Sequence, residues 1–264
     1  MTLTEPPTVS ALYTYPIKSC APVEVSSAYV DPQGFSGDRR FMVVDEQGRF
    51  VTARTHEKLT LVQPRFDGET LTITADSNKV TVNIHDLPPD RVSVDVWKDE
   101  VSARRCGPEV DSFFSDYLGG HYRLVFKDKD SIRRSRIGGD VSFADGAPVL
   151  AISEASLTAL NNKLPTPMIM QRFRPNIIVR SITAHGEDGF DPVRIGDVEF
   201  TSMGPCSRCV LTTIDPGTAE RHPSNEPLRT LMTYRQDETG KINFGQNLSP
   251  RWEVTVHVGD RITL

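Results

Sequence analysis

Short stretches in which apolar and polar residues alternate occupy most of the chain, a pattern that predicts strands with one buried and one solvated face. Residues 40–54 have an apolar run on each side of a Glu-Gln-Gly turn, and residues 59–75 repeat this pattern around Asp67-Gly68, so both are expected to form hairpins. In residues 91–105 the valines at 92, 94 and 96 alternate with polar residues. Further strands are expected at 80–84, 176–180, 193–200 and 209–214, with a final pair at 253–264.

Three segments carry helix signals. Residues 108–120 begin with a proline and end with a glycine pair, which is the usual asymmetry of helix ends. Residues 153–165 begin with Ser153 as a candidate N-cap and stop at a proline, and the third segment is 226–236. Because strands outnumber helices, the chain is predicted to have an α+β fold dominated by β-structure.

The composition is that of an ordinary folded protein and excludes several functional classes. Of the 264 residues 38% are hydrophobic and 25% charged, and the formal net charge of −5 argues against nucleic acid as a partner. No run approaches the roughly 18 apolar residues of a membrane helix, and the N-terminus has no basic region followed by an apolar core. We therefore expect a cytoplasmic protein that does not bind membranes, with residues 1–8 as a loose tail.

A change of composition marks residues 126–136, which hold two lysines and three arginines among polar residues. This segment is expected to be either a solvated linker or a lid over an anionic ligand. It places a domain boundary near 125–140.

Cys206 and Cys209 form a Cys-x-x-Cys pair, in a chain with two other cysteines. A structural zinc site needs four ligands, and the sequence has no second pair of this kind. A redox dithiol would begin a helix, whereas the β-branched run after Cys209 predicts a strand. Two packed thiols, or one thiolate that binds a transition metal, remain as further interpretations. Arg208 is expected to keep the Cys209 sulfur deprotonated.

Cations and polar groups recur at other junctions between loops and strands. Each is typical of a solvated surface, but together they suit a phosphate and a polar heterocycle. No Walker loop and no G-x-G-x-x-G motif is present, so such a site would be built from scattered side chains. The residues concerned are Lys18, Ser19, Arg39, Arg40, Arg172, Arg174, Asn176, Ser207 and Arg208.

Several motifs occur together in one order: YPIKSC, GDRRFMVV, VTAR, SEASL, FRPNIIV, IGDVEF, CSRCVLTTIDP, EPLRTLMTYR and FGQNL. In this the chain resembles the MOSC-domain proteins, and more closely the branch that contains the mitochondrial amidoxime-reducing component and its bacterial homologues. The resemblance covers nearly the whole chain. It implies an N-terminal MOSC β-barrel domain at residues 8–125 and a MOSC domain at residues 126–264.

The resemblance also implies a molybdenum cofactor, which is a molybdenum ion held by the dithiolene of a pyranopterin with a terminal phosphate. The protein ligand to the metal falls on Cys209. Residues expected around the pterin and its phosphate are Lys18, Ser19, Arg39, Arg174 and Asn176, with Ser207, Arg208, Thr52 and Arg54 as further contacts. Asp188 falls where relatives carry an acidic pair, so it is a candidate to relay protons or to orient a substrate, although it can equally be a loop carboxylate.

The activity implied by the resemblance is the reduction of N-hydroxylated compounds, such as hydroxylamines, amidoximes and N-hydroxylated bases, to amines. No further cysteines exist to hold an iron–sulfur cluster, so the electrons are expected from a separate ferredoxin- or flavoprotein-type donor. Two alternatives are a sulfur carrier or transferase with a persulfide on Cys209, and a non-catalytic cofactor-binding protein. As in many MOSC relatives, the chain is expected to be a monomer.

Overall fold

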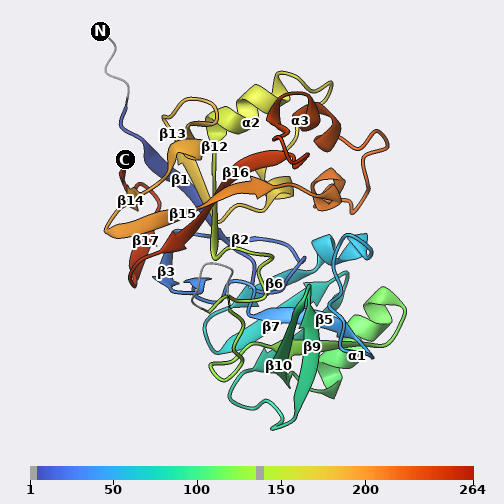
Figure 1. Cartoon of the computed structure of the whole chain (residues 1–264). Helices are drawn as coiled ribbons and strands as arrows, with labels where there is room; N and C mark the ends of the chain where they lie inside the picture. The colour runs from blue at the N-terminus through green and yellow to red at the C-terminus, as the bar shows by residue number, and fades with distance from the viewer. Residues whose placement is uncertain (1–4, 135–139) are drawn as a thin grey trace.

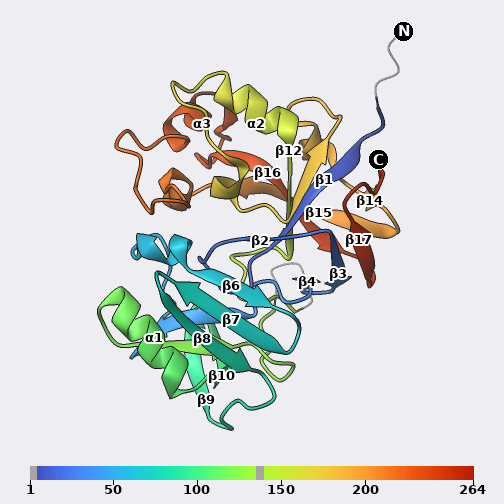
Figure 2. The ribbon, with the colours of Figure 1, turned by 180° about the vertical axis from the view of Figure 1, so that it is seen from behind.

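Two β-rich lobes, one above the other in Figure 1, make up the computed structural model, which describes residues 5–134 and 140–264. The upper lobe is built on an eight-stranded sheet with the strand order β18-β14-β15-β16-β12-β13-β1-β2. These strands span Thr8–Thr14 (β1), Val23–Val25 (β2), Val149–Ser153 (β12), Ile177–Arg180 (β13), Val193–Ile195 (β14), Val198–Ser207 (β15), Asn243–Pro250 (β16) and Ile262–Thr263 (β18). The helices α2 (Glu154–Asn161) and α3 (Leu228–Arg235) lie together at the far end of this lobe (Figures 1 and 2).

Segments from both ends of the sequence share the sheets of the upper lobe. β1 pairs antiparallel with β13, so that Leu12 lies opposite Ile177. A smaller sheet has the order β17-β3-β4, with β3 (Ser27–Asp31) between β4 (Gly34–Phe35) and β17 (Val254–His257). The strands β1 to β4, all within residues 8–35, therefore complete the lobe that the second half of the chain builds.

The lower lobe holds two further sheets and one helix. A four-stranded sheet has the order β5-β11-β10-β9, and a three-stranded sheet has the order β6-β7-β8. The helix α1 (Pro108–Leu118) lies beside β11 and β8 and covers them (Figure 2). The strands are β5 (Phe41–Asp45), β6 (Gln63–Phe66), β7 (Thr70–Ala75), β8 (Asn78–Asn83), β9 (Arg91–Val96), β10 (Asp99–Arg105) and β11 (Tyr122–Phe126).

The predicted fold class is confirmed, since strands dominate and three α-helices accompany them. Both hairpins at 59–75 and 91–105 form, and Val94 and Val96 are buried while the residues between them are not. Ser153 caps α2 as predicted, because its Oγ accepts a hydrogen bond from the Ser156 backbone N–H at 3.0 Å. None of the helices in the described part of the chain is long and apolar enough to cross a membrane.

Four local predictions were wrong. Residues 209–214 hold a 3₁₀ turn over Val210–Thr213 and no strand, because the Thr212 and Thr213 hydroxyls bond to carbonyls three residues back. β17 and β18 do not pair with each other, since they join β3 and β14. The hairpin predicted at 40–54 forms only around its turn: Val44 bridges Phe50 and the Val51 N–H donates to the Val43 carbonyl at 2.8 Å, but its second run is not a strand. Thr8 already belongs to β1, so it is not part of a tail.

Over its described residues, 126–134, the basic segment is neither solvated throughout nor a detached lid. Lys127 is fully buried and its Nζ pairs with Asp140 at 2.7 Å. Arg133 is also buried, pairs with Asp99 and donates to the carbonyls of Ser142 and Ala144. Two members of the predicted segment, 135 and 136, lie outside the described residues. Lys127 and Arg133 thus hold residues 140, 142 and 144, which precede β12, in place.

Candidate functional site

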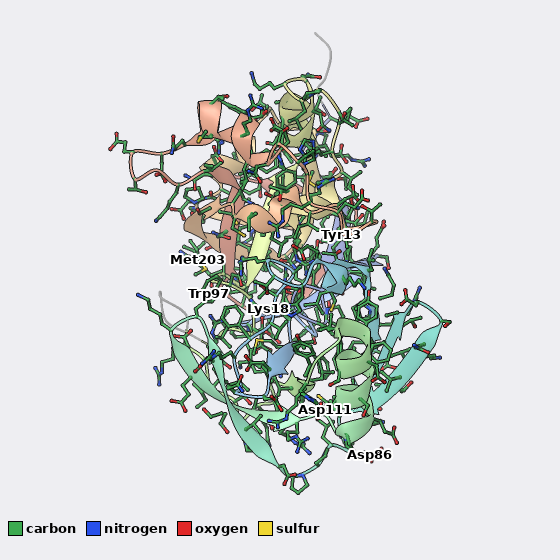
Figure 3. The ribbon with its side chains drawn as sticks, turned by 90° about the vertical axis from the view of Figure 1, so that its right-hand side faces the viewer. Tyr13, Lys18, Asp86, Trp97, Asp111 and Met203 are labelled. Atoms are coloured by element: carbon green, nitrogen blue, oxygen red, sulfur yellow. The ribbon has the colours of Figure 1, made fainter. Side chains whose placement is uncertain are left out.

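A cavity of about 150 Å³ lies between the two lobes. Lys18 lines this cavity. Figure 3 shows Lys18 and Trp97 in the region where the two lobes meet. Loops from both lobes supply the walls. All ten residues that the sequence places around the metal and the cofactor line this cavity: Lys18, Ser19, Thr52, Arg39, Arg54, Arg174, Asn176, Ser207, Arg208 and Cys209.

Three of these wall residues have an unusual backbone conformation. Ser19, Arg39 and Arg174 are not glycines, yet their φ angles are 70°, 48° and 56°. The left-handed region costs roughly 1–2 kcal/mol for such residues, so the surroundings must hold them there. The backbone N–H of Arg39 donates to the Tyr15 carbonyl at 2.8 Å, and that of Arg174 donates to Gln171 at 3.2 Å. Three of the nine non-glycine residues with a positive φ in the described chain therefore line this cavity.

Arg54 is the cation that contacts the Cys209 sulfur. Its Nε donates to the Cys209 Sγ at 3.3 Å, and its guanidinium lies over the Trp97 ring at 4.6 Å. The expectation that Arg208 would fill this role was wrong. Arg208 turns the other way, with Nη1 2.8 Å from the Cys206 Sγ and Nη2 bonded to the Phe173 carbonyl. Each sulfur of the Cys-x-x-Cys pair thus has its own guanidinium partner.

Asp145 is a wall residue that the sequence reasoning missed. Its carboxylate pairs with both Lys18 and Arg54, the latter at 2.8 Å, and the Trp97 indole N–H donates to it at 3.3 Å. Burial alone would raise the pKa of Asp145, but the two cations outweigh burial and hold it well below its usual value. In the sequence, residues 142–148 indicate only a turn. Asp145 was missed because Lys18 is far away in sequence and approaches it only in the folded chain.

Buried cations around the cavity have hydrogen-bonding capacity to spare. Among the described residues, three arginines at or next to the wall bury a nitrogen without any partner: Arg172 Nη1, Arg174 Nη2 and Arg208 Nε. Burial lowers the pKa of Arg174 to about 10, and it also lowers the pKa of Lys18. Buried donors without acceptors are costly. An anionic group with several acceptor oxygens would satisfy them, so the wall fits a phosphate.

The site provides few protein ligands for a metal. The described residues contain no group of three or more His, Cys, Asp or Glu side chains that could hold a metal ion. A metal bound at Cys209 would therefore take its other ligands from a cofactor. Soft sulfur ligands, such as this thiolate and a dithiolene, suit each other on one metal.

Asp188 does not lie in this cavity. It pairs with Arg235 at 2.8 Å and lines a second hollow with Tyr234, Asn243 and Gln246. The structure therefore brings together the predicted metal ligand and every predicted cofactor contact, but it leaves the predicted catalytic carboxylate outside. Asp145 is the carboxylate that lines this cavity together with Cys209, and Arg54 contacts both.

Comparison with known proteins agrees with this arrangement. The family model described as "MOSC N-terminal beta barrel domain" matches residues 6–121, and the model described as "MOSC domain" matches residues 138–263. Mitochondrial amidoxime-reducing component 1 of Homo sapiens is 35% identical over an alignment of 279 positions, which covers 97% of this chain and 82% of that protein. Mitochondrial amidoxime reducing component 2 of Rattus norvegicus is 37% identical over 247 residues, with 86% and 72% covered. The chain belongs to the MOSC-domain family, in the branch of the amidoxime-reducing components.

Proposed function

We propose that the protein is a molybdenum cofactor-dependent reductase that converts N-hydroxylated compounds to amines with electrons from a separate redox protein. The names of its relatives support the reaction. The observation that carries the proposal is that Cys209 lines the same cavity as several cationic and amide side chains. A donor of ferredoxin or flavoprotein type fits the proposal, because the four cysteines of the chain are too few for a cluster beside Cys209.

The wall residues divide into a sulfur ligand and an anion-binding set. Cys209 would bind the metal, and Arg54 Nε donates a hydrogen bond to its sulfur at 3.3 Å. Lys18, Arg39 and Arg174 would bind the terminal phosphate. When bound, the cofactor would supply the two-electron chemistry that removes the oxygen of an N–OH group.

Asp145 has a defined part in this scheme. Because Lys18 and Arg54 keep its pKa low, it is an ionised carboxylate at neutral pH and can only accept hydrogen bonds. It is therefore unsuited to donate a proton to the leaving oxygen. Its place beside Arg54 suits it to accept a hydrogen bond from the N–H or O–H of a substrate that approaches Cys209.

The test compares the wild-type protein with Cys209→Ser and, as a matched control, Cys206→Ser, all expressed in a host that makes the cofactor. Molybdenum is measured by mass spectrometry, pterin by the fluorescence of its oxidised form, and turnover with hydroxylamine and an aromatic amidoxime plus added reductant. We expect stoichiometric molybdenum and turnover in the wild type and in Cys206→Ser. Cys209→Ser is expected to lose turnover while its fold stays intact.

Other outcomes would redirect the assignment. Full turnover in Cys209→Ser would remove Cys209 as the ligand. Protein that contains a persulfide and no molybdenum or pterin would be a sulfur carrier. Protein that contains the cofactor but shows no turnover with any reductant would be a binding or delivery protein.

A further inference from the structure

Tyr15 lies behind the cavity wall and does not line the cavity itself. It follows β1 directly and leads into the turn that carries Lys18. Its side chain has no exposed surface, and its hydroxyl donates to the Pro175 carbonyl at 3.1 Å. A tyrosine of this kind is easily taken for an ordinary core residue.

Two wall arginines pack on its ring. The guanidinium carbons of Arg39 and Arg174 each lie 4.2 Å from the centre of the Tyr15 ring. An aromatic face carries negative potential and attracts a cation, more strongly where water is excluded. The ring therefore attracts two like charges that would otherwise repel each other in the same buried space.

The two arginines differ in the number of protein acceptors that hold them. Arg39 is held by Asp38, by Asn176 Oδ1 at 3.1 Å and by the Arg174 carbonyl at 3.2 Å. Arg174 donates through Nη1 to the Cys20 carbonyl at 2.7 Å, while its Nη2 is buried without a partner. A planar guanidinium that is held by one hydrogen bond and one ring face has a fixed orientation. The orientation of the Arg174 guanidinium is therefore set before any ligand binds.

We infer that Tyr15 is the positioning residue of the anion site, because its ring fixes Arg39 and Arg174 in the orientation that binds a phosphate. Tyr15 itself touches no ligand. The inference deepens the proposed function, on which it rests for the identity of the anion. The property that matters is the aromatic face, since the hydroxyl bonds only to a backbone carbonyl.

Binding of inorganic phosphate to the metal-free protein, measured by calorimetry, tests the inference. Tyr15→Phe keeps the aromatic face and should keep the wild-type affinity. Tyr15→Leu removes it and should weaken binding about tenfold, as expected for the loss of a buried cation–π contact. Tyr13→Leu is the matched control, because Tyr13 lies in β1 close to Tyr15 in sequence, whereas Arg39 and Arg174 stack on the ring of Tyr15. This control should bind phosphate like the wild type.

A second series covers the case in which Tyr15→Leu does not fold. Phenylalanine analogues with increasing ring fluorination, placed at position 15, keep the shape of the ring and remove its negative face. Phosphate affinity should fall along this series, and constant affinity would overturn the inference, as would unchanged binding in folded Tyr15→Leu. Absence of phosphate binding in the wild type would overturn it as well. Because phosphate binding needs neither molybdenum nor turnover, failure of the proposed reaction alone would leave these results unaffected.

Discussion

At Gly245 a single added methyl group should disturb the packing of the eight-stranded sheet. It lies in β16 with a φ of +84°, and a Cβ built there would stand 2.6 Å from Ile152 Cγ1 and 2.9 Å from the Ala151 carbonyl oxygen of β12. Gly245→Ala must therefore move β16 away from β12. The left-handed conformation costs an alanine about 1–2 kcal/mol, and overpacking adds about 1–3 kcal/mol. The free energy of unfolding should fall by roughly 2–5 kcal/mol, a large part of the roughly 5–15 kcal/mol of a typical domain.

Urea unfolding followed by circular dichroism measures this loss, and Gly259→Ala is the matched control. Gly259 has a φ of +94°, close to that of Gly245, but no atom lies within 4 Å of its added Cβ. The control should therefore lose only the backbone part, about 1–2 kcal/mol. Equal losses in the two variants would refute the argument from the close contact with β12.

Two further predictions concern hydrogen bonds away from the cavity. Burial alone would raise the pKa of Asp128, but hydrogen bonds from Arg91 and Ser131 lower it to about 2. Its stabilising effect is then complete above the ordinary carboxyl pKa of about 4 and disappears as the pH falls through 2. Arg91→Met should therefore lower the free energy of unfolding by about 1 kcal/mol at pH 7. As the pH falls from about 4 through 2, the difference should decrease to the part that comes from the bonds of Arg91 to Ser102 and Ser131; a difference independent of pH would contradict this. Ser153→Ala removes the cap of α2 and should cost about 1 kcal/mol in urea unfolding, whereas exposed Thr158→Ala in the same helix should cost less than half of that.

Much of the fold was readable from local patterns. The hairpins at 59–75 and 91–105 and the cap at Ser153 depend on residues close together in sequence, so alternation and capping rules were sufficient there. The run after Cys209 failed for a local reason, because threonine hydroxyls that bond to nearby carbonyls favour a turn over a strand. The pairing of β17 with β3 was unpredictable, since it joins residues more than two hundred positions apart.

For the site, motif order was sufficient to name the cavity walls but not the contacts within them. The sequence could place Arg208 beside Cys209 only because they are neighbours along the chain, whereas side-chain direction decides that Arg54 is the partner. Asp145 was missed for the same reason, since its significance comes from Lys18 and Arg54, which approach it only in the folded protein.

The sequence by itself determined the family, the β-dominated fold class and ten residues of one cavity, because residue types and their order record what the chain must bring together. Only the tertiary structure decided which arginine contacts which cysteine sulfur. It also decided that Asp188 lies outside the cavity and that two arginines stack on the ring of Tyr15. The physical reason is that charge–charge, cation–π and hydrogen-bond energies depend on distances of a few ångströms. Those distances are set by the packing of the two lobes and not by spacing along the chain.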